Sequence, residues 1–363
     1  MKRLISNITV GEWTFDFVSN VEIISSWDLL TDTCKIQIPK GIVFKRDGKI
    51  INNIIQGDDP IFRRGDNVVV KLGYDRTLKT AFVGRLAEVI PDKPIMLMCQ
   101  DDMYDLKQNS FVDEDINLKN TTLKELIDRL FQFGAAGFIS NTAIADIEIG
   151  DIKVKDSTVA KVLDYLRSKL GIVSYFRANE DETTTFVSGL PYSTEDPVNF
   201  TVEKAVDSDG VITYEDQDPS INAEKTTIFR KGTNIIEDDS LVYKRKDDQR
   251  VLVIGKSKQS DNTLIEARAG DEGGDITTIK YPELNQEQLN QFVQDRLANS
   301  KYEGFEGSFM AFLEPKVRHG ETVEFINNEV PEKNGVYLVK KVVTTFGYNG
   351  ARQEITLDNK IGG

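Results

Sequence analysis

The chain has few of the residues that build disulfide frameworks, metal centres and histidine-based active sites. Its 363 residues include two cysteines and one histidine. Cys34 and Cys99 each lie in a short apolar run, which favours buried, reduced thiols over a disulfide and suits folding in the cytosol. Because His319 is the only histidine, HExxH zinc sites and histidine-based triads elsewhere in the chain are excluded.

Long apolar runs and an excess of basic residues are also missing. No stretch approaches the roughly eighteen apolar residues of a membrane-spanning helix, and the first residues lack the apolar core of a secretory signal. The formal net charge of −14 argues against a protein that grips nucleic acid through a basic surface. We therefore expect a soluble intracellular product, with no membrane contact and no specific nucleic-acid binding.

No motif for catalysis or cofactor binding is present. The sequence contains no GxxxxGK[ST], GxSxG or CxxC, and its paired carboxylates lie in polar turns, where a catalytic acid would not be desolvated. We expect no catalytic residue, no cofactor and no metal site.

Two acidic loops carry closely spaced carboxylates. The segment 207–216 fails the EF-hand pattern, because Ala205 would occupy its first ligand position and no helices flank it. Asp271, Glu272 and Asp275 could hold a cation, but a solvated loop is the favoured interpretation.

Composition and alternation predict an α+β protein that is mainly β. A hydrophobic content of 39% and the length indicate a globular chain of two to four domains. Residues 1–108 are dominated by period-two strands, which we expect to form a small barrel or sandwich. Two apolar strand faces carry this prediction: Trp13, Phe15 and Phe17 on one, and Cys34, Ile36 and Ile38 on the other.

Helical spacing replaces alternation between residues 109 and 200, which predicts a small α+β insert with two helices, a strand and a hairpin. Thr122 with Glu125 predicts a capping box for the first helix, and Ser157 is the expected cap of the second. The expected apolar stripes and terminal glycines are Leu123, Leu126, Ile127, Leu130, Phe131 and Gly134, then Val159, Val162, Leu163, Leu166 and Gly171.

Strands return after residue 200, with one more helix opened by Asn285 and Gln288 in capping positions. The mixed-charge run 243–250 is interpreted as a solvated hairpin, with contact to an acidic neighbour as the alternative. The expected domains are two tube-like β-domains, residues 1–108 and residues 201–235 with 301–363, an α+β insert at 109–200, and an insert with a hairpin and one helix at 236–300.

One polar turn that opens a strand occurs twice. "RRGDNVVVKLGY" begins at residue 63 and "RHGETVEF" at residue 318. The two glycines are expected to tolerate positive φ, and the acid after each starts a strand. His319 stands where the first copy has Arg64, so we expect a structural role for it. The proposed correspondences are Arg63 with Arg318, Gly65 with Gly320, Asp66 with Glu321, Val68 with Val323, Phe82 with Tyr337, and, after a shift of two, Asp101 with Asp358.

The order of these elements resembles the baseplate hub family of contractile tails, which includes the late control protein D of tailed phages, the Mu-like tail protein and the N-terminal part of the spike protein VgrG. The resemblance covers nearly the whole chain. It depends on the paired turn-and-strand units, on "TTLKELIDRLF" and "STVAKVLDYLRSKLGIVSYF", and on the late "LNQFVQDRLANSKYEGFEGSF".

The resemblance implies a structural, non-enzymatic protein with two homologous tube-like β-barrel domains. It implies a homotrimer that joins the hexameric tail tube protein to the trimeric spike protein around a channel, with tape-measure and baseplate wedge proteins as further partners. Such a protein would be made in the bacterial cytoplasm and assembled into a phage tail or injection particle. An acidic channel wall that repels DNA is one hypothesis for the net charge. The alternatives are a VgrG-like spike base and a hydrolase with an acidic site.

Overall fold

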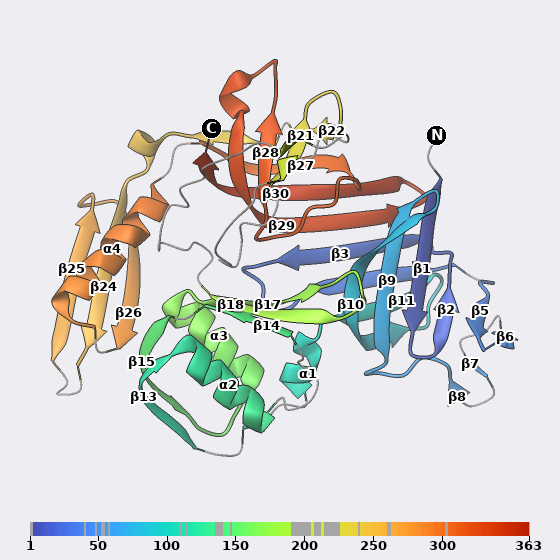
Figure 1. Cartoon of the computed structure of the whole chain (residues 1–363), viewed down its shortest axis with the longest axis horizontal. Helices are drawn as coiled ribbons and strands as arrows, with labels where there is room; N and C mark the ends of the chain where they lie inside the picture. The colour runs from blue at the N-terminus through green and yellow to red at the C-terminus, as the bar shows by residue number, and fades with distance from the viewer. Residues whose placement is uncertain are drawn as a thin grey trace.

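The computed structural model is mainly β and is organised around one long sheet of 16 strands, with two inserts attached (Figure 1). No helix in the part that the structure describes is long and apolar enough to cross a membrane. The structure describes residues 3–362 except for 40, 48, 52–54, 57–58, 109–110, 113–114, 135–140, 146, 190–204, 207–211, 214–225, 239, 260–262, 283 and 302–303.

The first β-domain is formed by the strands that precede the first helix. Alternation predicts its core, since Cys34, Ile36 and Ile38 are all buried on one face of β4. The predicted face of Trp13, Phe15 and Phe17 is wrong at its last member, because β2 ends at Phe15 and leaves Phe17 63% exposed. Its strands are β1 (Leu4–Val10), β2 (Trp13–Phe15), β3 (Asn20–Ser26), β4 (Thr33–Ile38), β5 (Phe44–Arg46), β6 (Lys49–Ile51), β7 (Ile55–Gln56), β8 (Asp59–Pro60), β9 (Asn67–Tyr74), β10 (Thr77–Ile90) and β11 (Ile95–Gln100).

The second β-domain is formed by two groups of strands on either side of the second insert. Its own core contains the aromatic rings of Phe229, Phe309 and Phe325, with centroids 5.2 Å apart along the series. Its elements are β21 (Thr226–Arg230), β22 (Ile235–Glu237), β23 (Val242–Lys244), β27 (Gly304–Phe312), β28 (Thr322–Ile326), the short 3-10 helix η2 (Pro331–Lys333), β29 (Gly335–Gly347) and β30 (Gly350–Gly362).

The two β-domains share one sheet because β29 pairs with β3. Seven residue pairs join these strands, from Lys341 opposite Ser26 to Gly347 opposite Asn20. Gly347 is required there, because a Cβ at this position would lie 2.4 Å from the carbonyl oxygen of Ser19. The strand order β22-β27-β30-β29-β3-β4-β11-β10 therefore runs without interruption through both domains, and Figure 1 shows β29 and β3 side by side.

The first insert lies against one side of this sheet, with its helices on the far side of β17 and β18 (Figure 1). Its predicted helical stripes are confirmed as buried, apart from the partly exposed Phe131. The predicted hairpin is confirmed as β17 and β18. The elements are α1 (Met103–Gln108), β12 (Phe111–Val112), β13 (Ile116–Thr122), α2 (Leu123–Gly134), β14 (Asn141–Ile144), β15 (Glu148–Val154), β16 (Ser157–Thr158), α3 (Val159–Leu170), β17 (Val173–Ala178) and β18 (Thr184–Gly189).

The helix caps differ in detail from those expected. The cap of α3 is Thr158 and not Ser157, because the Thr158 hydroxyl accepts from the Lys161 N–H at 3.3 Å. Thr122 does accept from the Glu125 N–H at 3.3 Å, but the Glu125 carboxylate accepts from the Thr121 hydroxyl instead of closing the predicted box. The α3 terminus is as expected, with Gly171 in the left-handed region.

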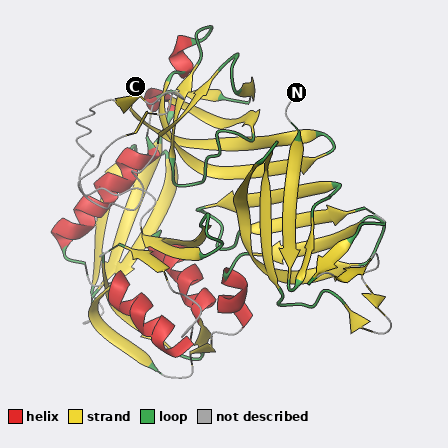
Figure 2. Cartoon of the chain, turned by 45° about the vertical axis from the view of Figure 1, so that its right-hand side comes forward, coloured by secondary structure: helices red, strands yellow, loops and turns green. Residues whose placement is uncertain are grey.

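The second insert packs one helix on a small sheet, and Figure 2 shows this helix across the strands. Gly255 permits this contact, because a Cβ there would lie 2.4 Å from a methyl carbon of Val293. The expected helix starts after Asn285, and the side chain of Gln288 lies outside the described residues. The elements are η1 (Lys246–Asp248), β24 (Val251–Lys258), β25 (Leu264–Gly270), β26 (Asp275–Pro282) and α4 (Gln286–Ser300), preceded in the chain by the isolated pair β19 (Ala205–Val206) and β20 (Ile212–Thr213).

The mixed-charge run 243–250 does not form the hairpin expected of it. Its first residues complete β23, which pairs with β27, and η1 follows. Most of the acidic segment 207–216 lies outside the described residues.

Candidate assembly site

The two copies of the polar turn have the same backbone geometry. Gly65 has φ of 92° and Gly320 has φ of 77°, a region that glycine adopts without a side-chain penalty. The Gly65 N–H donates to the carbonyl of Leu86 at 2.8 Å, and the Gly320 N–H donates to the carbonyl of Val339, also at 2.8 Å. Each turn opens one strand, β9 or β28, and is anchored by an equivalent hydrogen bond to the next strand along the chain, β10 or β29.

The acid after each glycine closes its turn. The Asp66 carboxylate accepts from the backbone N–H of Arg63 at 2.7 Å, and the Glu321 carboxylate accepts from that of Arg318 at 2.9 Å. The backbone N–H of each acid donates back to the carbonyl of the same arginine, at 3.0 and 3.2 Å. The extra methylene of glutamate is thus accommodated without loss of the contact, which explains why either acid serves.

The strand register corrects part of the proposed alignment. Leu86 and Val339 occupy the same place, because the N–H of each donates at 2.9 Å to the carbonyl of the turn acid. Gly84 is therefore the counterpart of Tyr337, and the predicted match with Phe82 is wrong by two residues. The first hairpin is longer than the second between the turn and this anchor, which the single offset of 255 could not reveal.

A bulge follows the anchor in both domains. The register of β10 with β11 shifts between Leu86 and Glu88, and that of β29 with β30 shifts between Val339 and Lys341. Cys99 lies opposite Leu86, and Leu357 lies opposite Val339. The counterpart of Asp101 is consequently Asn359, one residue beyond the Asp358 that was expected.

His319 is buried, whereas a polar turn predicts exposure. Its ring packs edge-on against Tyr175 of the first insert at 4.5 Å, and its Nε2 lies 3.7 Å from a carboxylate oxygen of Asp32. Its counterpart Arg64 also contacts a tyrosine, with Nε 3.0 Å from the hydroxyl of Tyr104. Each turn therefore supports the insert as well as its own strand.

The tip of the β17–β18 hairpin bridges both β-domains. The Glu180 carboxylate accepts from the Thr80 N–H of β10 at 2.9 Å, and lies 3.7 Å from Arg318 of the second turn. Lys316 donates to the carbonyl of Thr80. Burial lowers the pKa of Lys316 to about 8, with the nearby Arg318 adding to the effect. This junction locks the insert between the domains.

Two buried carboxylates at the same junction were not anticipated from the sequence. The Asp101 carboxylate accepts from the backbone N–H of Asp32 at 3.0 Å and from that of Met103 at 3.1 Å. Burial, and then the neighbouring Asp32, raise the pKa of Asp101 well above its usual range. The order strand, acid, helix in "CQDDMYDL" was the available signal, because an acid at a helix start accepts backbone N–H bonds.

The oxygens of both carboxylates are engaged in hydrogen bonds within the chain, mainly with backbone N–H groups. The carboxylate of Asp32 accepts from the Ser25 hydroxyl and from the Ser26 N–H at 3.1 Å. In the described part of the chain, no three His, Cys, Asp or Glu side chains are grouped to hold a metal ion. The cleft beside them is also lined by residues from both β-domains and the insert, so it lies where these three parts of the chain meet.

Of the acidic loop at 271–275, Asp271 forms an ion pair with Lys301 beyond the end of α4. The hydrogen bond from Lys301 lowers the pKa of Asp271. This carboxylate serves to tie the loop to the helix.

Comparison of the whole chain with solved structures returns tail proteins. A tail protein from Neisseria meningitidis MC58 superposes with a TM-score of 0.62 at 14% identity, covering 98% of this chain and 96% of that one. The 43 kDa tail protein of prophage MuSo2 from Shewanella oneidensis gives 0.61 at 13% identity, with 99% and 100% covered. The chain has the fold of phage tail proteins. No protein-family model and no curated protein sequence matches it.

A component of a bacterial secretion system also shares this fold. An Escherichia coli component of the type VI secretion system, described as structurally similar to the T4 bacteriophage tail proteins gp27 and gp5, superposes with a TM-score of 0.55 at 10% identity. The match covers 97% of this chain and 76% of that protein. The shared fold therefore spans both β-domains and both inserts.

Proposed function

We propose that this chain is the baseplate hub protein of a phage tail or a related injection particle, and that it acts as a homotrimer. The observation that carries the proposal is the joining of two β-domains with the same turn, anchor and bulge into one continuous sheet. Three such chains would present six similar units. The role is structural and involves no catalytic step.

Symmetry gives the physical reason for a duplicated domain. A six-fold tail tube and a three-fold spike cannot meet through identical contacts unless one ring carries both symmetries. A trimer with two similar domains per chain meets both requirements. It would contact the tail tube protein on one side and the spike protein on the other, with tape-measure and baseplate wedge proteins as further contacts.

The hypothesis of an acidic channel wall gains no support from the sheet. One face of the continuous sheet packs on the core, so the opposite face is the one available to line a channel. Acidic and basic side chains alternate there, as with Glu22 opposite Lys35. Charge balance along a channel would still disfavour tight DNA binding. The charged residues of this face include Glu22, Lys35, Arg85, Glu88, Glu237, Glu306, Lys341, Arg352 and Glu354.

The proposal is tested by measuring the assembly of the purified chain. Light scattering after size exclusion, over a hundredfold range of concentration, is expected to reach three times the monomer mass. Negative-stain averages of that species are expected to be rings with six similar lobes. A monomer at every concentration, or a closed dimer, contradicts the proposal.

The hydrolase alternative has its own test at the buried carboxylates. Asp101→Asn should reduce stability without removing any hydrolytic activity of the preparation, since Asp101 holds backbone N–H groups. Turnover of an ester, peptide or glycoside substrate that disappears in this variant supports the hydrolase instead.

A further inference from the structure

Within one chain the two β-domains are joined by strand pairing between β29 and β3. The corresponding strand edges elsewhere in the two domains have no such partner among the described strands. Within the chain, the segment Lys341–Gly347 of β29 lies beyond its pairing with β28 and there pairs with β3. The counterpart of Lys341 in the first β-domain is Glu88, because both follow the same bulge. Among the described strands, β10 pairs with β9 only up to Arg85 and beyond it with β11 alone.

The counterpart of β3 in the second β-domain is β22 together with β23. Cys34 of β4 lies opposite Cys99, and Gly307 of β27 lies opposite Leu357, so Cys34 and Gly307 correspond. Thr33, which lies opposite Ile24, then corresponds to Glu306.

Val242 lies opposite Glu306 and is therefore the counterpart of Ile24. Tyr243 and Lys244 take the places of Ser25 and Ser26.

The edge of β23 is exposed where β3 is covered. Val242 is 65% exposed and Tyr243 is 43% exposed, although the Tyr243 ring packs on Phe305 at 5.1 Å. Among the described strands, β23 pairs with β27 alone. An exposed strand edge with apolar side chains favours pairing with another strand.

We propose that β23 of one copy pairs antiparallel with residues 88–90 of β10 in a second copy, in the register that β3 and β29 adopt within the chain. Lys244 then lies opposite Glu88, Tyr243 opposite Val89, and Val242 opposite Ile90. This inference rests on the proposed trimer and names the edges and the register that close it.

The side chains at the two edges are complementary. Lys244 and Glu88 are exposed residues of opposite charge, where the pairing within the chain has Lys341 opposite an uncharged serine. The pairing also covers Val242 with the half-buried Ile90. The Lys244 ammonium is already placed on this side by an ion pair with Glu306.

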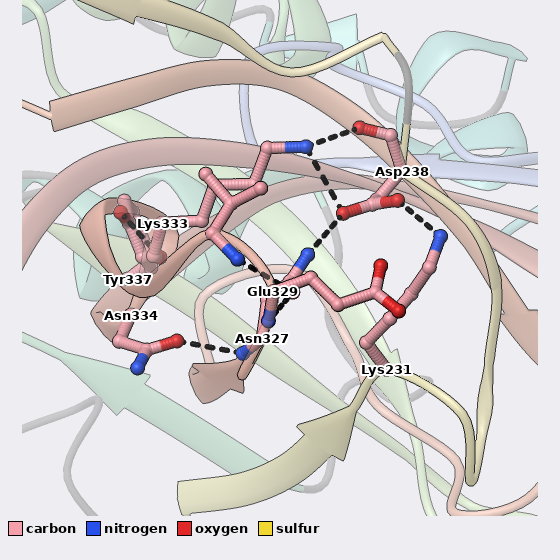
Figure 3. A network of polar contacts seen from close by, with 8 residues as sticks. Lys231, Asp238, Asn327, Glu329, Lys333, Asn334 and Tyr337 are labelled. Atoms are coloured by element: carbon pink, nitrogen blue, oxygen red, sulfur yellow. Dashed lines mark hydrogen bonds and ion pairs between the residues drawn. The ribbon is translucent and has the colours of Figure 1, made fainter.

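A buried polar network holds the segment that presents β23. Asp238 is 3% exposed, accepts from Asn327 at 2.9 Å and from Lys333 at 3.0 Å, and pairs with Lys231 (Figure 3). Burial alone would raise its pKa, but hydrogen bonds from Lys231 and Lys333 outweigh this and lower it. The carboxylate is thus an anchor between β22 and β23, and fixes the position of the edge.

The contact between chains is expected to be shorter than the contact within one chain. The β10–β11 hairpin turns after Ile90, whereas β29 continues to Gly347. Three residue pairs therefore replace the seven that join β29 to β3. The trimer should dissociate on dilution before its chains unfold.

Cysteine pairs test the register directly. Val242→Cys with Ile90→Cys in one chain is expected to form disulfides between chains under mild oxidation and to give a covalent trimer on a non-reducing gel. The control is Val242→Cys with Asp92→Cys, two residues out of register, which should give about tenfold less product. The native Cys34 and Cys99 do not compete, because both are buried with raised pKa values.

The outcomes separate this inference from the trimer itself. A trimer by light scattering that gives no covalent product, or equal product from both cysteine pairs, overturns the register while the proposed trimer stands. A monomer without covalent product overturns both.

Charge reversal gives an independent test. Lys244→Glu is expected to raise the trimer dissociation constant by about tenfold or more, because it places two acids opposite each other. Adding Glu88→Lys should restore assembly. Lys124→Glu on the exposed face of α2, which also breaks an ion pair with an aspartate, is the matched control and should change nothing. Failure of the double reversal to restore assembly counts against the pairing.

Discussion

The first and second β-domains agree at the polar turn and the bulge, but they are bordered by different strands. Next to the first hairpin, β1 runs antiparallel to β9, whereas β21 runs parallel to β28 beside the second. The shared part of each domain leads into the contact between domains, and the part that differs lies away from it. The two β-domains are therefore alike next to the contact that joins them and differ at the strands that lie farther from it.

A second difference lies at the equivalent positions Gly84 and Tyr337. A Cβ at Gly84 would lie 2.1 Å from the carbonyl oxygen of Gln100, whereas Tyr337 is fully buried and donates its hydroxyl to the carbonyl of Lys333 at 3.0 Å. At equivalent strand positions, the first β-domain thus brings two backbones close together, whereas the second fills the space with an aromatic side chain.

The largest effect is expected from emptying the core of one domain. Phe309→Ala, at a side chain 2% exposed, should lower the free energy of unfolding by about 4 kcal/mol. Trp13 lies in the core of the first β-domain, whereas Trp27 packs on the first insert and lies beneath Lys340 of β29. A Trp27→Phe background therefore leaves Trp13 as a reporter of the first β-domain. Because β29 and β3 join the domains in one sheet, we expect tryptophan fluorescence and circular dichroism to shift together in urea.

The control is Ile36→Ala, at the equivalent position of the first β-domain. It should lower the free energy of unfolding by about 3 kcal/mol, again in a single transition. A Phe309→Ala protein whose fluorescence transition stays at the original urea concentration would show that the domains unfold independently.

The next effect is a pH dependence that only the second turn carries. Lys316 stands where the first β-domain has Ile61, and burial lowers its pKa to about 8 from 10.5. Between these values the unfolded chain binds more protons than the folded chain, so stability should rise with pH by about 3 kcal/mol. Arg318, Glu180 and Glu321 face the same ammonium.

Lys316→Ile should lack this rise, while wild type shows it in urea titrations between pH 8 and 10. Identical pH slopes in the two proteins would contradict the assignment to Lys316.

A smaller effect is expected at Gly84, where the two domains differ. Gly84→Ala should destabilise the chain by about 2 kcal/mol, because the new Cβ must displace the backbone at Gln100. Thermal unfolding followed by circular dichroism measures this. A Gly84→Ala protein as stable as wild type would contradict this prediction, because β11 would then move away from the new Cβ without a loss of unfolding free energy.

The smallest effects should be equal in the two turns. Gly65→Ala and Gly320→Ala each force a side chain into positive φ, and each should cost about 1 kcal/mol. Nothing lies within 4 Å of a Cβ at Gly65, so this variant also isolates the conformational cost from the clash at Gly84. If the losses of unfolding free energy in Gly65→Ala and Gly320→Ala differ by more than the expected loss of about 1 kcal/mol, the two turns are not equivalent.

Local sequence patterns predicted the strands and helices well where the buried residues recur with the period of a strand or a helix. Alternation identified the buried face of β4, and helical spacing identified the stripes of α2 and α3. It failed at Phe17, because alternation does not say where a strand ends. The offset of 255 found both turns but misplaced Phe82, because a hairpin of different length shifts every later residue.

The amino-acid order alone was enough to predict a mainly β chain, its two inserted helical segments and its repeated turn, since these depend on neighbours within a few residues. Tertiary structure alone decided that β29 pairs with β3, that His319 is buried, and that Asp32 and Asp101 meet. These contacts join residues far apart in the chain, and their register is chosen by packing of whole sheets, which no local periodicity encodes.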